Sequence, residues 1–331
     1  MDIDAFSAAH AAQWQRLAEL ARKRTLTGAE SDELVERYQS ASADLSAITS
    51  TAGSTAVGAK LAVDLSRARL RLTGTSDEAL SGVARFAFIA LPAAFYRIRW
   101  LALAVAMATI LISALYAAWI LNDPRVLAQM GDDAQLQQFV GQDFVNYYSE
   151  NPAASFTGQV WTNNAWIAAQ CIAFGIVGVY VPYIIAGNAQ NLGTSAALMF
   201  HYGEGDTFFQ YILPHGLLEL TAVFFAAAAG LRIFWAWIAP GARTRGQALA
   251  EDARSMFTVA VGLAVVLFVS GIIEGFVTPS SLPVAVKIGI GVLALGAFLA
   301  YVIVLGGRAR RAGETGDLGR FDAGARRVFA G

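Results

Sequence analysis

Three ionisable side chains within apolar stretches are the residues of this 331-residue chain most able to do chemistry. His215 and Glu219 are four residues apart near the start of an apolar run over 214–238, so a helix would place them on one face. Glu274 lies near the end of the next apolar run, 257–277. A carboxylate at the centre of a membrane helix costs about 2.5–3.5 kcal/mol or more, so it usually has a partner or a function.

These residues are expected to meet, because consecutive membrane crossings are antiparallel and place them at similar depth. Asn163 and Asn164, at the start of an apolar run over 164–186, join the polar cluster if the chain crosses the membrane six times.

Three interpretations of this polar cluster remain open. It could be a hydrogen-bond cluster that ties crossings together, a divalent metal site, or a relay for protons or substrate. Imidazole with carboxylates suits zinc, which makes His215, Glu219 and Glu274 the candidate ligands. A zinc hydrolase is disfavoured, because the sequence has no His-Glu-x-x-His motif and only three histidines. It also has no phosphate-binding loop, nucleophile elbow or dinucleotide fingerprint, so no enzyme class is indicated.

The composition indicates a membrane protein with a separate polar region. Hydrophobic residues make up 56% of the chain and charged residues 15%, against about 25% in soluble domains, and the mean hydropathy is +0.49. The net charge of −1 gives no indication of nucleic-acid binding. The single cysteine, Cys171, excludes a disulfide framework within one chain.

The polar N-terminal region predicts a cytosolic helical bundle over residues 1–75, with helices over about 2–24, 27–46 and 55–72. An alternative places the arginine-bearing third helix on anionic lipid. Residues 76–99 predict an amphipathic helix at the membrane interface, and residues 307–331 a basic cytosolic tail.

The membrane domain is predicted to span 100–306. Five apolar runs are long enough to cross about 30 Å of hydrocarbon: 101–121, 164–186, 214–238, 257–277 and 284–306. Lys287 is close enough to the end of its run to reach the interface. Basic residues before 100, within 239–256 and after 306 place these segments and both termini in the cytoplasm, which requires a sixth passage.

The sixth passage is assigned to a broken crossing over 187–212. This stretch is semi-polar and interrupted by glycine, and irregular backbone at membrane depth is tolerated only where it is buried or lines a wet cavity. Asn188, Asn191 and Gly193 are the candidate cavity residues. The alternative is an interfacial loop, five crossings and an external C-terminus. Gly289, Gly291 and Gly296 permit close helix contact between protomers, which predicts a homodimer.

Several sequence elements resemble the stage II sporulation protein M family of bacterial integral membrane proteins. The resemblance covers about 85–305. It is carried by Trp161-Thr-Asn-Asn-Ala-Trp166, Gly187-Asn188, Asn191-Leu-Gly193, Leu213-Pro-His-Gly-Leu-Leu-Glu-Leu-Thr-Ala222, Ala229-Gly-Leu-Arg232, Pro240-Gly-Ala-Arg-Thr-Arg245 and Ile273-Glu-Gly-Phe-Val-Thr-Pro279.

The resemblance implies an all-α, polytopic, non-enzymatic component of the bacterial plasma membrane. It implies a scaffold role in remodelling of the cell envelope, together with envelope-remodelling proteins. Family members are often encoded near an AAA ATPase of the MoxR class, for which the cytosolic helical region would be a docking surface. The alternative function, suggested by the polar cluster and the broken crossing, is a transporter or a lipid-handling protein.

Overall fold

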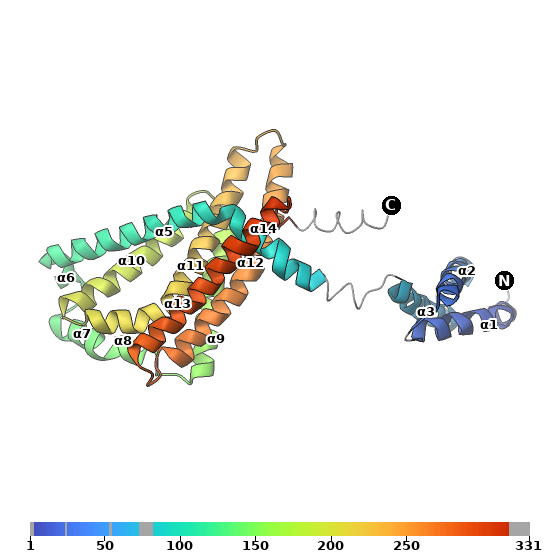
Figure 1. The fold of residues 1–331 in the computed structure, drawn as a ribbon, viewed down its shortest axis with the longest axis horizontal. Helices are drawn as coiled ribbons and strands as arrows, with labels where there is room; N and C mark the ends of the chain where they lie inside the picture. Colours follow the sequence, from blue (N-terminus) through green and yellow to red (C-terminus); the bar gives the residue numbers. More distant parts are fainter. Residues whose placement is uncertain (1–2, 24, 53–54, 73–81, 318–331) are drawn as a thin grey trace. The chain divides into compact units, whose positions relative to one another are not determined.

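The computed structural model describes the chain except residues 1–2, 24, 53–54, 73–81 and 318–331. The protein is all-α, and the described residues contain no strand (Figure 1). The chain divides into two compact units, Met1–Ala84 and Arg85–Gly331. Most of the basic tail expected over 307–331 lies outside the described residues.

The first unit is a bundle of three helices, α1 (Ile3–Arg22), α2 (Gly28–Ala52) and α3 (Ala56–Leu72). The three helices occur where the apolar periodicity predicts them. Their apolar faces enclose Leu17, Leu20, Leu34 and Ile48, none of which is accessible to solvent. Burial of side chains of this size is the main source of stability in a small domain.

The second unit begins with one long helix, which replaces the predicted pair of an interfacial helix and a first crossing. The helix is continuous over Gly82–Asn122 and contains a π-helical turn, η1 (Phe86–Ala90), before α5 (Leu91–Asn122). Pro92 follows this turn at the N-terminal end of α5, where a missing backbone N–H is tolerated. The proline therefore does not end the helix, and no interfacial helix separate from α5 exists over residues 82–99.

The predicted crossing over 164–186 is wrong in its boundaries. Two helices occupy the region, α9 (Ala153–Ala173) and α10 (Tyr180–His201), with a turn over 174–179 between them. The predicted break within 187–212 is also absent, because α10 is continuous through residues 187–201. Its polar side chains are satisfied without a break: Asn188 donates to Ile184 O, and Gln190 donates to the Tyr116 hydroxyl.

The remaining elements complete the second unit. Short helices α6 (Pro124–Met130) and α7 (Asp133–Gln138), the π-turn η2 (Phe139–Asp143) and α8 (Phe144–Asn146) connect α5 to α9. They are followed by α11 (Gly205–Ile238), α12 (Arg245–Ile272), η3 (Ile273–Val277), α13 (Val284–Ala300), η4 (Tyr301–Leu305) and α14 (Gly306–Arg311).

Four helices of the described chain are long and apolar enough to cross a membrane: Gly82–Asn122, Gly205–Ile238, Arg245–Val277 and Val284–Arg311. Helices α9 and α10 pack along them but are less apolar. At a rise of 1.5 Å per residue, α9 and α10 are each roughly 30 Å long, which is the thickness of the hydrocarbon core.

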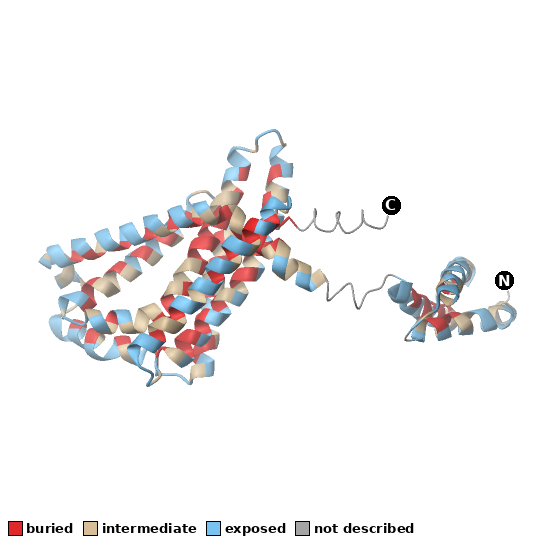
Figure 2. Cartoon of the chain, viewed as in Figure 1, coloured by how far each residue is buried: buried red, intermediate tan, exposed pale blue. Residues whose placement is uncertain are grey.

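The core of the second unit lies around α11, which contacts α5, α9, α10, α12 and α13. Its residues from Ala222 to Gly230 are all buried, and Figure 2 shows burial concentrated where these helices meet. Several of these residues are alanine, so the surrounding helices can approach α11 closely. The central position of α11 matters for function, because this helix carries two of the three candidate site residues.

Candidate functional site

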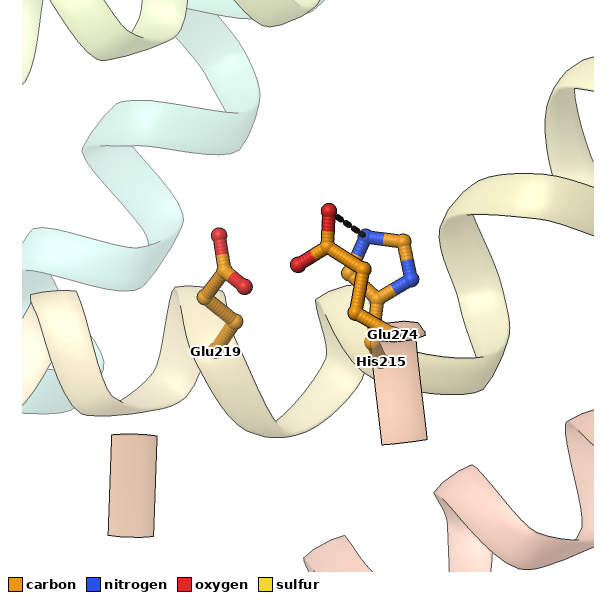
Figure 3. Close-up of side chains that lie close together, drawn as sticks. All are labelled: His215, Glu219 and Glu274. Atoms are coloured by element: carbon orange, nitrogen blue, oxygen red, sulfur yellow. Dashed lines mark ion pairs between the residues drawn. The ribbon is translucent and has the colours of Figure 1, made fainter. Parts of the chain in front are cut away.

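The structure brings His215, Glu219 and Glu274 together (Figure 3). One ligand atom from each lies within 4.8 Å of the others. His215 Nε2 lies 3.8 Å from Glu274 Oε1. His215 and Glu274 are 5% and 4% exposed, so the cluster is enclosed by the protein.

Two elements position these side chains. His215 and Glu219 are one turn apart on α11, about three turns after its start at Gly205. They were expected in the first turns of a helix starting at 214, so the site lies deeper along its helix than the sequence indicated. Glu274 lies in η3, a π-helical turn that ends the α12 segment. Such turns are rare and are frequent at functional sites.

A hydrogen-bond network positions His215. Its Nδ1 atom lies 3.2 Å from Thr278 Oγ1, and Ser270 Oγ donates to His215 O over 3.2 Å. Lys287 Nζ donates to Thr278 O over 2.8 Å. Lys287 itself is 3% exposed, and its ammonium lies beside Thr278 at the end of the preceding helix, so its reach to the interface stays a prediction. Burial of its charge is offset in part by a carbonyl acceptor.

Tyr148 covers the cluster from the connection between α5 and α9. Its ring centroid lies 5.8 Å from that of His215, and the residue is buried. Ser270 and Tyr148 were not predicted as site residues, because each is a common residue without a motif of its own. Thr278 is part of the element Ile273–Pro279, but its contact with His215 was not predicted either.

Two carboxylate oxygens in the cluster are unpaired. Glu219 Oε2 and Glu274 Oε2 are buried, and neither has a hydrogen-bond partner among the described residues. Glu219 as a whole is only partly buried, but this atom is inaccessible. Asn164 and Ser270 lie close enough to the Glu219 carboxyl to interact with it, although neither donates a hydrogen bond of normal geometry to Oε2. An unsatisfied buried carboxylate oxygen is costly and requires an explanation.

The other residues predicted for the site lie elsewhere. Asn163 lies on the outer face of α9 and is exposed, whereas its neighbour Asn164 is buried. Asn191 is exposed on α10, and Asn188 bonds within its own helix. Gly193 lets α10 approach α5, since a Cβ atom there would lie 2.6 Å from Ser113 O. These three residues therefore take part in the surface and the packing of α10.

The arrangement restricts what the cluster can do. Two buried carboxylates this close cannot both be ionised without a compensating positive charge. A proton shared between them or a bound cation supplies that charge. Zinc ligands lie about 2.0–2.2 Å from the ion in tetrahedral geometry, so two of them are roughly 3.4 Å apart. The three candidate ligand atoms lie within 4.8 Å of one another, so the cluster would contract on binding such an ion.

A second buried acid, Asp252, is the centre of an ion-pair network that the sequence interpretation missed. This α12 residue has no accessible surface, and its carboxylate accepts a hydrogen bond from Arg97. Arg232 Nη2 lies 3.2 Å from Asp252 Oδ2 as an ion pair, without the geometry of a hydrogen bond. Arg243 Nη2 lies 4.0 Å from the same group. Arg97 and Arg243 were interpreted as topology signals, and Arg232 only as part of a family element, but an arginine within an apolar run is a sign of a buried partner.

The comparisons with known proteins agree with this fold. Residues 102–279 match the family model described as stage II sporulation protein M, and residues 4–74 match a domain of unknown function (DUF8413). No curated protein and no solved structure matches the chain. The first match covers more than half of the 331 residues and includes His215, Glu219 and Glu274. The chain therefore belongs to the stage II sporulation protein M family of membrane proteins.

Proposed function

We propose that this protein is a non-enzymatic scaffold of the bacterial plasma membrane that acts in remodelling of the cell envelope. The observation that supports a scaffold is the enclosed polar cluster. A substrate pathway through His215 would need a polar cavity that reaches the imidazole. Neither the apolar groove between α5, α11 and α13 nor the polar cavity beside Arg97 and Arg243 has His215 among its lining residues, and the ring of Tyr148 lies against His215. An enclosed cluster suits a structural connection between α11 and the end of α12 better than transport.

The envelope role is tested by depletion of the protein in its own bacterium. New cell-wall synthesis would be followed with a fluorescent D-amino acid, and wall composition by muropeptide analysis. Depletion is expected to change both, and the wild-type gene is expected to restore them. An unchanged wall, together with solute or proton flux in proteoliposomes containing the purified protein, would support the transporter alternative instead.

The same proposal assigns a divalent cation, with zinc as first candidate, to His215, Glu219 and Glu274. One imidazole and two carboxylates are ligands that zinc accepts. The two unpaired buried oxygens are the groups that such an ion would satisfy. When bound, the ion would supply a cross-link between α11 and η3 and balance the negative charge.

Elemental analysis of purified protein tests the metal assignment. Wild type is expected to contain about one divalent ion per chain. Glu219→Gln retains most hydrogen bonding but removes a ligand charge, so its metal content should fall at least about tenfold. Glu150→Gln, at an exposed position outside the cluster, is the control and should keep the wild-type content. Wild-type protein without a stoichiometric ion would contradict the assignment and leave a hydrogen-bonded cluster.

Two protein partners follow from this function and from the family. The three-helix N-terminal unit offers a helical surface for a MoxR-class AAA ATPase. A second copy of the chain is the other partner, through the face of α13 that carries Gly289 and Gly296. A Cβ atom at either glycine meets nothing within 4 Å, whereas Gly291 packs within the chain against Pro214 O.

A further inference from the structure

The second unit has an apolar groove of about 660 Å³ between α5, α11 and α13. Ala106 and Leu103 line it from α5, Leu217 and Leu220 from α11, and Leu299 from α13. Thr221 also lines the groove, but its hydroxyl donates to Leu217 O over 2.7 Å. The wall therefore offers a ligand almost no free hydrogen-bonding group and suits a hydrocarbon chain.

One end of the groove carries a single charged side chain. Arg99 is the only charged residue that lines it within the described chain. Its Nη1 atom donates to Tyr96 O over 2.6 Å, and its guanidinium lies 3.6 Å from the centroid of the Tyr96 ring. No carboxylate of the described residues forms an ion pair with it, in contrast to Arg97, which is paired with Asp252. Arg99 thus has guanidinium donors left for an anion.

The length of the groove suits one leaflet of a membrane. It extends along α5 from Tyr96 to Ile110, which is roughly 21 Å of helix at 1.5 Å per residue. One leaflet contributes about 15 Å of the hydrocarbon core, half of its total thickness, and the remaining length reaches the headgroup region. Trp100 beside Arg99 is 68% exposed, as is typical of aromatic side chains at the membrane interface.

We propose that this groove is a binding site for one membrane phospholipid, with an acyl chain between α5, α11 and α13 and its phosphate on Arg99. Guanidinium groups form bidentate hydrogen bonds with phosphate oxygens, and these bonds are stronger than those between neutral groups. The acyl chain would cover apolar side chains of three helices at once. The site lies apart from the His215 cluster, so it does not depend on the function proposed above.

The proposal is tested by native mass spectrometry of the purified full-length protein in mild detergent. Phosphatidylglycerol is titrated as the ligand, and diacylglycerol with the same chains is the comparison without phosphate. Wild type is expected to bind one phosphatidylglycerol molecule and to bind diacylglycerol at least roughly fivefold more weakly, because one arginine near a lipid phosphate contributes about a factor of five.

Two variants separate the headgroup contact from the groove. Arg99→Gln should weaken phosphatidylglycerol binding roughly fivefold or more and leave diacylglycerol binding unchanged. Ala106→Trp fills the groove and should weaken both lipids. The matched controls are Arg308→Gln, at an exposed arginine outside the groove, and Ala108→Trp, at an exposed α5 position that does not line it. Both controls should bind as wild type does.

Several results would overturn the proposal. Equal affinity of wild type for the two lipids would remove the role of the phosphate, and so would an Arg99→Gln variant that retains wild-type affinity. Unchanged binding by folded Ala106→Trp would place the lipid outside the groove. A wild-type spectrum of lipid-free dimers that Ala106→Trp converts to monomers would identify a second copy of the chain as the occupant instead.

Discussion

At the scale of single residues, the membrane unit balances buried negative charge in two different ways. Asp252 is surrounded by Arg97, Arg232 and Arg243, so its counter-charges belong to the chain itself. The pair Glu219 and Glu274 has a single nearby imidazole and retains two unpaired oxygens. The charge of Asp252 is thus balanced by the chain itself, although its Oδ2 atom accepts no hydrogen bond, whereas the Glu219 and Glu274 pair is the one whose charge a proton or a cation would balance.

Removal of the Asp252 carboxylate is expected to destabilise the protein strongly. Asp252→Ala leaves the Arg97 guanidinium without its buried partner, and breaking such a pair costs about 3–5 kcal/mol. The low end, about 3 kcal/mol, is expected because Arg232 and Arg243 are about one-third exposed and can be solvated. The thermal unfolding midpoint in detergent measures the effect.

Two further variants make this result specific. Asp252→Asn keeps an acceptor for Arg97 and should lower the midpoint less than Asp252→Ala does. Asp143→Ala removes an exposed carboxylate and should leave the midpoint within about 0.5 kcal/mol of wild type. A wild-type midpoint for Asp252→Ala would show that the network contributes little to stability.

The sequence predicted the convergence of His215, Glu219 and Glu274 because helix periodicity and antiparallel crossings determine it. It could not predict the supporting residues. Tyr148 lies in the connection before α9 and has no sequence signature, and Thr278 has one, but the signature does not show that its hydroxyl lies beside His215. The bond from Lys287 to Thr278 O likewise depends on the fold.

At the scale of helices, the boundary errors have one physical cause. Hydropathy separates apolar from polar stretches of a sequence. The turn over 174–179 is as apolar as the helices beside it, so hydropathy does not reveal it. The chain turns where α9 meets α11. There Gly230 lies so close to Cys171 O that a Cβ atom on Gly230 would collide with it. A Cβ atom on Gly175 would in turn collide with the backbone of Gly230. The semi-polar stretch after 187 stays helical with its polar side chains accommodated: Asn188 bonds within the helix, Gln190 bonds to the Tyr116 hydroxyl, and Asn191 is exposed.

The contact between α9 and α11 predicts the effect of Gly230→Ala. The added methyl would collide with the carbonyl of Cys171 and lie 2.9 Å from Val181 Cγ2, so the helices must move apart. Such overpacking typically costs about 1–3 kcal/mol, measured as a lower thermal midpoint in detergent. Gly289→Ala is the control, because its Cβ atom meets nothing within 4 Å and alanine favours a helix. A Gly230→Ala midpoint at or above that of Gly289→Ala would contradict the observed packing.

The start of α2 predicts the acid sensitivity of the N-terminal unit. Lys23 Nζ donates to Glu30 over 2.5 Å, and the Thr27 backbone N–H donates to the same carboxylate over 3.0 Å. These contacts lower the pKa of Glu30 from 4.5 to about 2, with the Lys23 hydrogen bond as the largest cause. Because this pKa is lower in the folded state, the stabilisation is present above about pH 4.5 and is lost as the pH falls towards 2.

Thermal unfolding of a fragment with residues 1–84 measures this effect across that pH range. The midpoint is expected to fall on acidification, and Lys23→Gln should make the fall smaller because the folded pKa of Glu30 rises towards its ordinary value. Lys60→Gln removes the same charge at an exposed position on α3 and should follow the wild-type profile. Identical pH profiles for wild type and Lys23→Gln would show that this contact does not contribute.

At the scale of the whole molecule, the six membrane passages stay a prediction, which requires neighbouring long helices of the second unit to be antiparallel. Thr157 Oγ1 donates to Gly271 O and the Trp161 indole to Ala264 O, so α9 and α12 are antiparallel. His215 lies beside Glu274, which makes α11 and α12 antiparallel as well. Arg97, Arg243 and Arg254 then lie towards one end of this unit. An excess of arginine on one side marks the cytoplasmic side of a membrane protein.

Cysteine labelling in intact cells tests this topology in a Cys171→Ala background. If α9 and α10 both cross the membrane, the turns of the unit alternate between its two sides. An impermeant maleimide is then expected to label Gln138→Cys, before α9, and Glu204→Cys, between α10 and α11. It should label Ile176→Cys and Ala242→Cys only after the cells are permeabilised, because these positions lie beside the arginine-rich end. All four positions are exposed in the structure, so burial does not account for protection. Labelling of Ala242→Cys in intact cells would show that the arginine-rich end faces the outside, opposite to the predicted orientation. Labelling of Ile176→Cys together with Glu204→Cys would show that α9 and α10 do not cross, because both turns would then lie on the external side.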